Sequence, residues 1–192
     1  MTTTILTPGV SARAAAERAL KLAAGVWLAT AIAGQALFLT YILAFYGPST
    51  LGGDFAAWAK NESLIKGYVP GDTAGNLAFG AHVLMAAVVT FGGTLQLVPQ
   101  LRARAPGAHR WIGRAFLTTA ILASLVGVWM TWGRPTFSSL PSAIAITLDA
   151  ALILIFGGLA WRAAVKRDLA AHRRWAMRAF LVANSEIGRA HV

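Results

Sequence analysis

The sequence predicts an all-α integral membrane protein, a helical bundle with four full transmembrane helices, a truncated fifth helix and a parallel internal repeat. Three observations lead to this fold class. The 192 residues are 57% hydrophobic and only 12% charged, about half the charged fraction of a soluble domain. Four apolar runs are each long enough to cross a hydrocarbon core of about 30 Å. A basic motif beginning with His and Arg occurs twice, each time after an apolar run.

The first apolar run is Leu22–Tyr46, preceded by a polar and basic lead, residues 1–21. Ala31-Ile32-Ala33 resembles the small-residue site at which a signal peptide is cleaved, so a removed signal is the alternative interpretation. However, the apolar character continues to Phe45, far past an ordinary signal core. The length therefore favours a retained transmembrane helix.

The remaining elements follow from the same length criterion. Residues 47–75 form a mixed loop, in which we expect a short interfacial helix around Trp58 because Trp favours the headgroup level. The predicted helices are then Asn76–Val98, Trp111–Trp132, Ala143–Trp161 and Trp175–Ser185. The last of these would span roughly 16 Å, half a bilayer. We therefore predict a bundle over residues 22–185 whose fifth helix is incomplete.

The distribution of Lys and Arg predicts the orientation. Short cytoplasmic loops carry an excess of these residues. Three lie on one side of the predicted crossings: Lys60, Lys66 and Arg134. Thirteen lie on the other: Arg13, Arg18, Lys21, Arg102, Arg104, Arg110, Arg114, Arg162, Lys166, Arg167, Arg173, Arg174 and Arg178. We therefore expect a bacterial inner-membrane protein with a cytoplasmic N-terminus.

The last seven residues, Glu186 to Val192, form a polar tail at what would be membrane depth. Their back-translation in one frame contains a common short-read sequencing adapter. We expect this tail to be non-native and the natural protein to continue past Ser185. The alternative is a genuine polar C-terminus, so no role is assigned to the tail.

The two basic turns resemble each other. The first contains His109-Arg110-Trp111 and Arg114, and the second contains His172-Arg173-Arg174-Trp175 and Arg178. Each turn follows a predicted membrane helix with one ionisable residue and opens another helix, so the unit is present twice in the same orientation. The stretch from Gly80 to Phe116, together with the second turn, resembles the bacterial family of predicted multi-pass membrane proteins called domain of unknown function 2306. The resemblance implies a membrane location and no established activity.

Two ionisable residues lie inside predicted membrane helices. His82 and Asp149 are each about six residues from the outer end of their helix, at similar depth. Intramembrane ionisable groups usually face a partner or a cavity. We predict that the two side chains approach each other inside the bundle, with Gln35 of the first helix. They would handle a proton or bind a ligand; the alternative is a purely structural hydrogen bond or a hydrated Asp149.

The two rim motifs have two interpretations. His109 and His172 could ligate a b-type haem, since imidazole is a common axial ligand. Alternatively the motifs anchor the bundle, with Trp111 and Trp175 at headgroup level. In that case the basic side chains would bind anionic lipid headgroups: Arg110, Arg114, Arg173, Arg174 and Arg178.

Composition excludes several classes of site. With no Cys there is no disulfide, thiolate metal site or iron–sulfur cluster. The net charge of +10 lies in turns between apolar runs and not on one face, so nucleic acid is not an expected partner. No hydrolase or metalloprotease motif appears, and enzymatic activity stays open. Three hypotheses remain: a module that binds a small ligand, lipid or proton at the repeat interface, a haem or quinone electron-transfer protein, and a structural or assembly subunit.

Overall fold

The computed structural model describes residues 10–60, 67–134 and 139–189, and the described residues form helices and connecting turns without a strand. Four helical segments are long and apolar enough to cross a membrane: Ala12–Gly52, Thr73–Gln96, Pro106–Gly133 and Leu140–Val165. This confirms the predicted all-α membrane bundle with four full crossings. The lead Met1–Gly9, Lys66 and the end of the tail lie outside the described residues.

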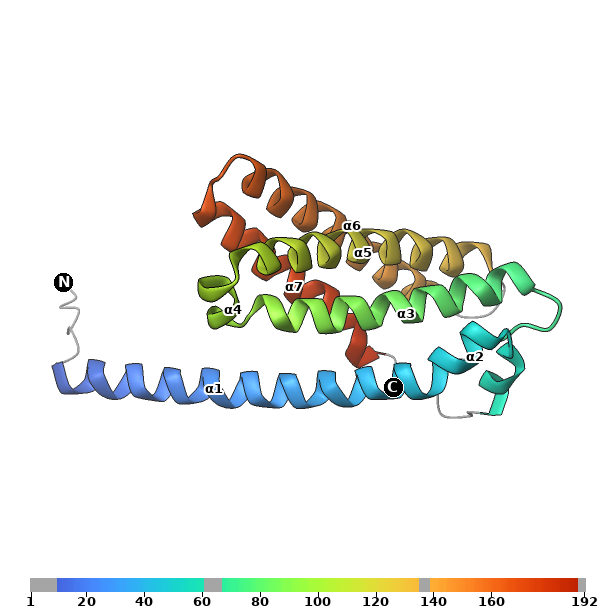
Figure 1. Ribbon diagram of the computed structural model, residues 1–192, viewed down its shortest axis with the longest axis horizontal. Coiled ribbons are helices and arrows are strands. Elements are labelled where there is room, and N and C mark those ends of the chain that lie inside the picture. The colour runs from blue at the N-terminus through green and yellow to red at the C-terminus, as the bar shows by residue number, and fades with distance from the viewer. Residues whose placement is uncertain (1–9, 61–66, 135–138, 190–192) are drawn as a thin grey trace, which may run out of the picture.

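The first segment is longer than predicted. Helix α1 (Val10–Tyr41) continues through the π-helical turn η1 (Ile42–Tyr46) into α2 (Gly47–Gly52). The 41 residues of the span extend about 61 Å at 1.5 Å per residue, twice the hydrocarbon thickness. Helix α1 thus begins at Val10, within the polar and basic lead of residues 1–21. In Figure 1 the first turns of α1 project beyond the bundle.

The other helices also begin earlier than predicted. Helix α3 is Thr73–Gln96, α5 is Pro106–Gly133, α6 is Leu140–Val165 and α7 is Leu169–Arg189, with the short α4 (Pro99–Arg104) between α3 and α5. Proline stands in the first turn of α4, α5 and α6, where its missing N–H costs nothing. The chain enters α7 through Arg167 in a left-handed conformation, φ 57°. The two basic motifs are therefore the first turns of helices and not loops.

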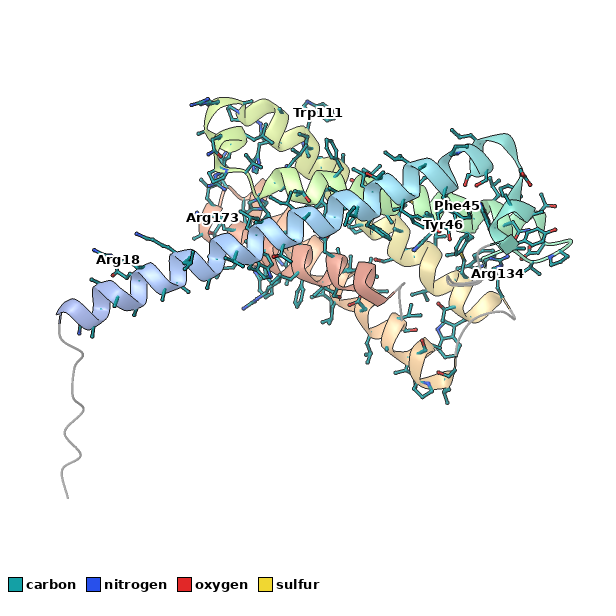
Figure 2. All side chains as sticks on the ribbon, turned by 90° about the horizontal axis from the view of Figure 1, so that it is seen from below. Arg18, Phe45, Tyr46, Trp111, Arg134 and Arg173 are labelled. Atoms are coloured by element: carbon teal, nitrogen blue, oxygen red, sulfur yellow. The ribbon has the colours of Figure 1, made fainter. Side chains whose placement is uncertain are left out.

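The repeat is visible in the arrangement of the helices. α3 and α6 run in one direction, and α5 and α7 return in the other, so that α4 and the α6–α7 turn lie at the same end (Figure 1). Trp111 and Arg173 lie toward this end and Arg134 and Tyr46 toward the opposite one (Figure 2). We call the end formed by α4 and the first turns of α5 and α7 the basic end.

The core lies between the two repeats. Its buried side chains come from α3, α5, α6 and α7: Val89, Phe116, Leu117, Ala120, Ile153, Ala160, Ala179, Phe180 and Ala183. Phe116 and Phe180 end the same R-A-F triplet in the two motifs. A Cβ on Gly93 of α3 would stand 3.0 Å from the Phe116 ring and 3.1 Å from the Phe180 ring. The absence of a side chain at Gly93 therefore lets Phe116 of α5 and Phe180 of α7 pack closely against α3.

A second cluster holds the end of the first segment against α3. The predicted helix around Trp58 is the 3₁₀ helix η2 (Phe55–Lys60), but Trp58 is only 3% exposed. Its ring packs against Tyr46 and Phe79, and its Nε1 donates to Ser49 Oγ at 2.7 Å. Trp58 is therefore a packing residue inside the protein, and the position of η2 at headgroup level stays a prediction.

Candidate functional site

Gln35 lies at the centre of a polar network that joins three helices. Its Nε2 donates to Asn184 Oδ1 of α7 at 3.0 Å, and its Oε1 accepts from Thr94 Oγ1 of α3. Asn184 Nδ2 in turn donates to the Phe180 carbonyl at 2.8 Å. Two of the three helices, α1 and α3, are parts of apolar spans, where amide and hydroxyl groups act as interhelical contacts.

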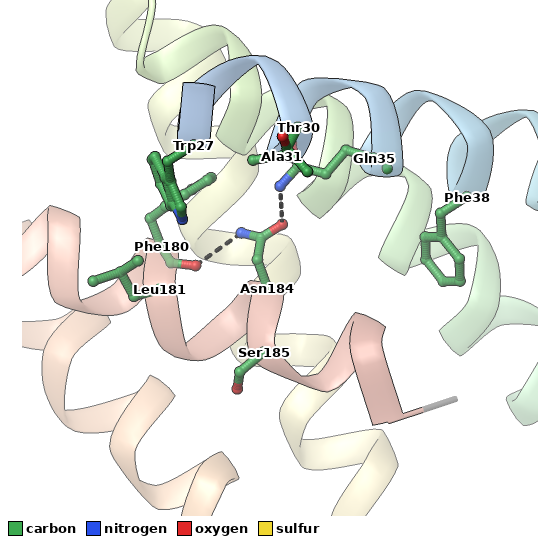
Figure 3. A pocket seen from close by; sticks show the side chains of 10 residues that line it. Trp27, Thr30, Ala31, Gln35, Phe38, Phe180, Leu181, Asn184 and Ser185 are labelled. Carbon is green, nitrogen blue, oxygen red and sulfur yellow. Dashed lines mark hydrogen bonds between the residues drawn. The ribbon is translucent and has the colours of Figure 1, made fainter. Parts of the chain in front are cut away.

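A groove opens beside this network, between α1 and α7 (Figure 3). Its volume is about 380 Å³, within the range of small-molecule pockets. The lining is mostly apolar, and Gln35, Asn184, Ser185 and Thr30 supply its polar side chains. The other side chains in the wall include Trp27, Phe38, Phe180 and Leu181. Apolar walls around a few polar groups are the usual composition of a ligand pocket.

The other two predicted intramembrane residues, His82 and Asp149, form hydrogen bonds outside the Gln35 network. His82 Nδ1 lies 3.0 Å from the Ala123 carbonyl of α5, and its ring covers Gly127. Asp149, buried in α6, accepts from Ser185 Oγ of α7 at 3.5 Å. The hydrogen bonds thus connect His82 to α5, Asp149 to α7, and Gln35 to α3 and α7. The pairing of His82 with Asp149 stays a prediction.

At the basic end the two motifs occupy matching positions. The backbone N–H of His109 donates to the Ala105 carbonyl, and the backbone N–H of His172 donates to the Asp168 carbonyl. Each bond lies in the first turn of its helix. His172 and the guanidinium groups of Arg102 and Arg110 are close enough to His109 to act on its charge. The two motifs therefore lie at the same end of the bundle (Figure 1), and a ligand shared by the two rim histidines stays a prediction.

The two imidazoles differ in their bonding. His172 Nδ1 lies 3.0 Å from the Ala160 carbonyl and donates to it. His109 Nδ1 is buried and has no hydrogen-bond partner among the described residues. The carbonyl of His109 accepts from Gln96 Nε2 at 3.0 Å, which ties the end of α3 to the start of α5.

Each motif also contains a cation–π pair. The Arg114 guanidinium lies 5.4 Å from the Trp111 ring centre, and the Arg178 guanidinium lies 4.5 Å from the Trp175 ring centre. Trp111 is 70% exposed, whereas Trp175 packs against Phe156. Arg110, Arg173 and Arg174 are exposed around these pairs. The described residues contain no group of three or more metal-ligating His, Cys, Asp or Glu side chains.

The opposite end holds a site that the sequence did not reveal. Arg134, only 6% exposed, donates to Asp72 Oδ2 at 2.8 Å, to Asn76 Oδ1 at 2.9 Å and to the Gly67 carbonyl at 3.2 Å. Asp72 also caps α3 by accepting from the Gly75 N–H at 2.8 Å. The Gly75 bond and the Arg134 guanidinium hold the pKa of Asp72 below its usual range. The only sequence signal was an Asp three residues before Gly75, a capping pattern.

Comparison with known proteins now gives the family. The family model described as "Predicted membrane protein (DUF2306)" matches residues 79–190, more than half of the chain. The chain belongs to this family. The DUF2306 match covers both basic motifs and most of α3 through α7, and it confirms the resemblance seen in the sequence. No curated protein and no solved structure matches the chain.

Proposed function

We propose that this DUF2306 protein is a membrane module that binds a small amphipathic molecule in the groove between α1 and α7. The observation that carries the proposal is the amide pair of Gln35 and Asn184 in the wall of a largely apolar groove of about 380 Å³. The sequence placed a ligand at the interface of the two repeats. The groove instead lies between one repeat helix, α7, and α1 outside the repeats.

The hydrogen-bonding capacity of the groove indicates the class of ligand. A primary amide has two N–H donors. The bonds from Gln35 Nε2 to Asn184 and from Asn184 Nδ2 to the Phe180 carbonyl use one donor of each amide. A second N–H on each amide can therefore donate to an acceptor oxygen. An apolar molecule with a carbonyl oxygen, such as a quinone or the ester region of a lipid, fits this donor set.

The test is to identify what the protein retains. The full chain is extracted from the membrane without detergent in lipid nanodiscs, and the bound molecules are quantified by mass spectrometry. Wild type should retain one amphiphile in stoichiometric amount, and Asn184→Leu and Gln35→Leu should lose it. Thr40→Val is the matched control, because Thr40 is exposed on α1 and bonds only within its own helix to the Ala36 carbonyl. Equal retention by all four proteins would contradict the proposal.

A second candidate function is b-type haem binding at the basic end, as the sequence suggested. One observation favours it: His172 donates its Nδ1–H to a backbone carbonyl, as ligating histidines usually do, which leaves Nε2 as the free lone pair. His109 would be the second ligand. A Soret band in the purified protein, lost in both His109→Ala and His172→Ala, would establish this function. No band after haem is supplied would dismiss it.

The orientation is part of the proposal. Thirteen Lys and Arg residues on one side against three on the other favour a cytoplasmic N-terminus and a cytoplasmic basic end in the inner membrane of a bacterium. The exposed Trp111 and the arginines around it would then lie among the anionic headgroups of the inner leaflet.

A further inference from the structure

The basic end contains a cluster of four cationic or ionisable side chains that the groove does not use. His109 and Arg110 stand at the start of α5, directly after the short helix α4 that carries Arg102, and His172 stands in the first turn of α7 at the same end of the bundle (Figure 1). Arg102, His172 and Arg110 are within electrostatic range of His109. No carboxylate among the described residues lies within ion-pair distance of these four side chains; the ion pair that the structure shows, Arg134–Asp72, is at the opposite end. The cluster therefore carries positive charge without an internal counter-ion.

Comparison of the two repeats indicates where an anion would stand. In the second repeat Asp168 precedes α7 and accepts from the Ala171 N–H at 2.9 Å. The matching residue of the first repeat is Ala105, which has no side chain able to cap α5. The N-cap of α7 thus carries a carboxylate, whereas the N-cap of α5 carries no acidic side chain. His109, in the first turn of α5, has a buried Nδ1 without a hydrogen-bond partner among the described residues.

We propose that His109, Arg102, Arg110 and His172 form a binding site for a single phosphate group, and that the phosphate belongs to an anionic phospholipid. Guanidinium groups match phosphate oxygens in geometry and charge. In the proposed orientation the basic end meets the headgroup layer of the inner leaflet, and clusters of this kind between membrane helices bind lipid headgroups. The phosphate would supply the negative charge that Asp168 supplies in the other repeat.

Native mass spectrometry of the full chain, in micelles with equal amounts of phosphatidylglycerol and phosphatidylcholine, tests the site. Wild type should retain one phosphatidylglycerol in preference to phosphatidylcholine. Arg102→Gln should lower this retention about fivefold, the effect of about one basic residue near a membrane surface. Arg104→Gln is the matched control, because Arg104 lies on the same short helix but is not among the groups that act on His109.

A second variant separates binding from folding. Ala105→Asp places a carboxylate where the other repeat has Asp168, so it should reduce lipid retention while the helix keeps or gains stability. Inorganic phosphate identifies the source of the ligand: if it displaces the lipid in wild type, the site recognises the phosphate alone, and if it does not, the acyl chains are also required. Equal retention by wild type, Arg102→Gln and Ala105→Asp, or equal retention of the two lipids, would overturn the proposal. The site rests on the proposed orientation but does not involve the groove, so its failure can be told apart from a failure of ligand binding between α1 and α7.

Discussion

Replacing Gly93 by Ala tests how closely α5 and α7 pack against α3. The new Cβ would stand 3.0–3.1 Å from ring carbons of Phe116 and Phe180, closer than ordinary van der Waals contact. Both rings are buried, at 4% and 5% exposure, so neither can move without disturbing the core. The substitution therefore overpacks a place where residues of both motifs meet the same helix.

The change in the free energy of unfolding is the difference between two opposing effects. Ala in a helix interior is more favourable than Gly by about 1 kcal/mol. Overpacking a buried site costs about 1–3 kcal/mol. The net result for Gly93→Ala is a free energy of unfolding lower by up to about 2 kcal/mol. Gly158→Ala supplies the reference, because Gly158 is exposed on α6 and has nothing within 4 Å of its added Cβ.

The assay is equilibrium unfolding in mixed detergent micelles, followed by circular dichroism and tryptophan fluorescence. We expect Gly158→Ala to equal or exceed wild type in stability and Gly93→Ala to be about 2 kcal/mol less stable than Gly158→Ala. If the two variants unfold together, Phe116 and Phe180 do not close on Gly93 and the packing of the repeats is wrong.

Two further predictions concern the end of the bundle opposite the basic end. Because the pKa of Asp72 is lowered in the folded state, its contribution to stability is present above its unfolded pKa of about 3.9 and is lost as pH falls through the folded value. Asp72→Asn should remove this acid sensitivity in pH-dependent thermal unfolding; an unchanged profile would assign the sensitivity to another group. Ser49→Ala removes the acceptor of the buried Trp58 Nε1–H and should lower the free energy of unfolding by about 1–3 kcal/mol; wild-type stability in the same assay would mean that this bond is not needed.

The architecture could be predicted because bilayer thickness sets a length that apolar runs must meet. The same rule does not fix where a helix ends. The helices after the basic turns were expected to begin at Trp111 and Trp175, but Pro106 starts α5 and Leu169 starts α7, ahead of the His-Arg-Trp motifs. Proline in a first turn favours a helix start, and that signal was available at Pro106.

The polar contacts were harder to predict because they depend on rotation about each helix axis. Depth along the helices led to the prediction that His82 and Asp149 pair, which stays a prediction. Depth does not reveal that His82 bonds to the α5 backbone or that Gln35 bonds to Thr94 and Asn184. Arg134 and Asp72 are 62 residues apart, and nothing local to either residue indicates the other. The repeat could be predicted because it fixes the end of the bundle at which each motif lies, and both motifs open their helices at the same end (Figure 1).

The placement of both motifs on one side of the membrane can be measured directly, because the sequence contains no cysteine. Single cysteines at three exposed positions, Ala103→Cys in α4, Lys166→Cys before α7 and Ala56→Cys in η2, are labelled with a membrane-impermeant maleimide in intact cells and in inside-out vesicles. The cysteines at residues 103 and 166 should react only in inside-out vesicles, and the cysteine at residue 56 only in intact cells. Labelling of residues 103 and 166 from opposite sides would contradict the parallel repeat.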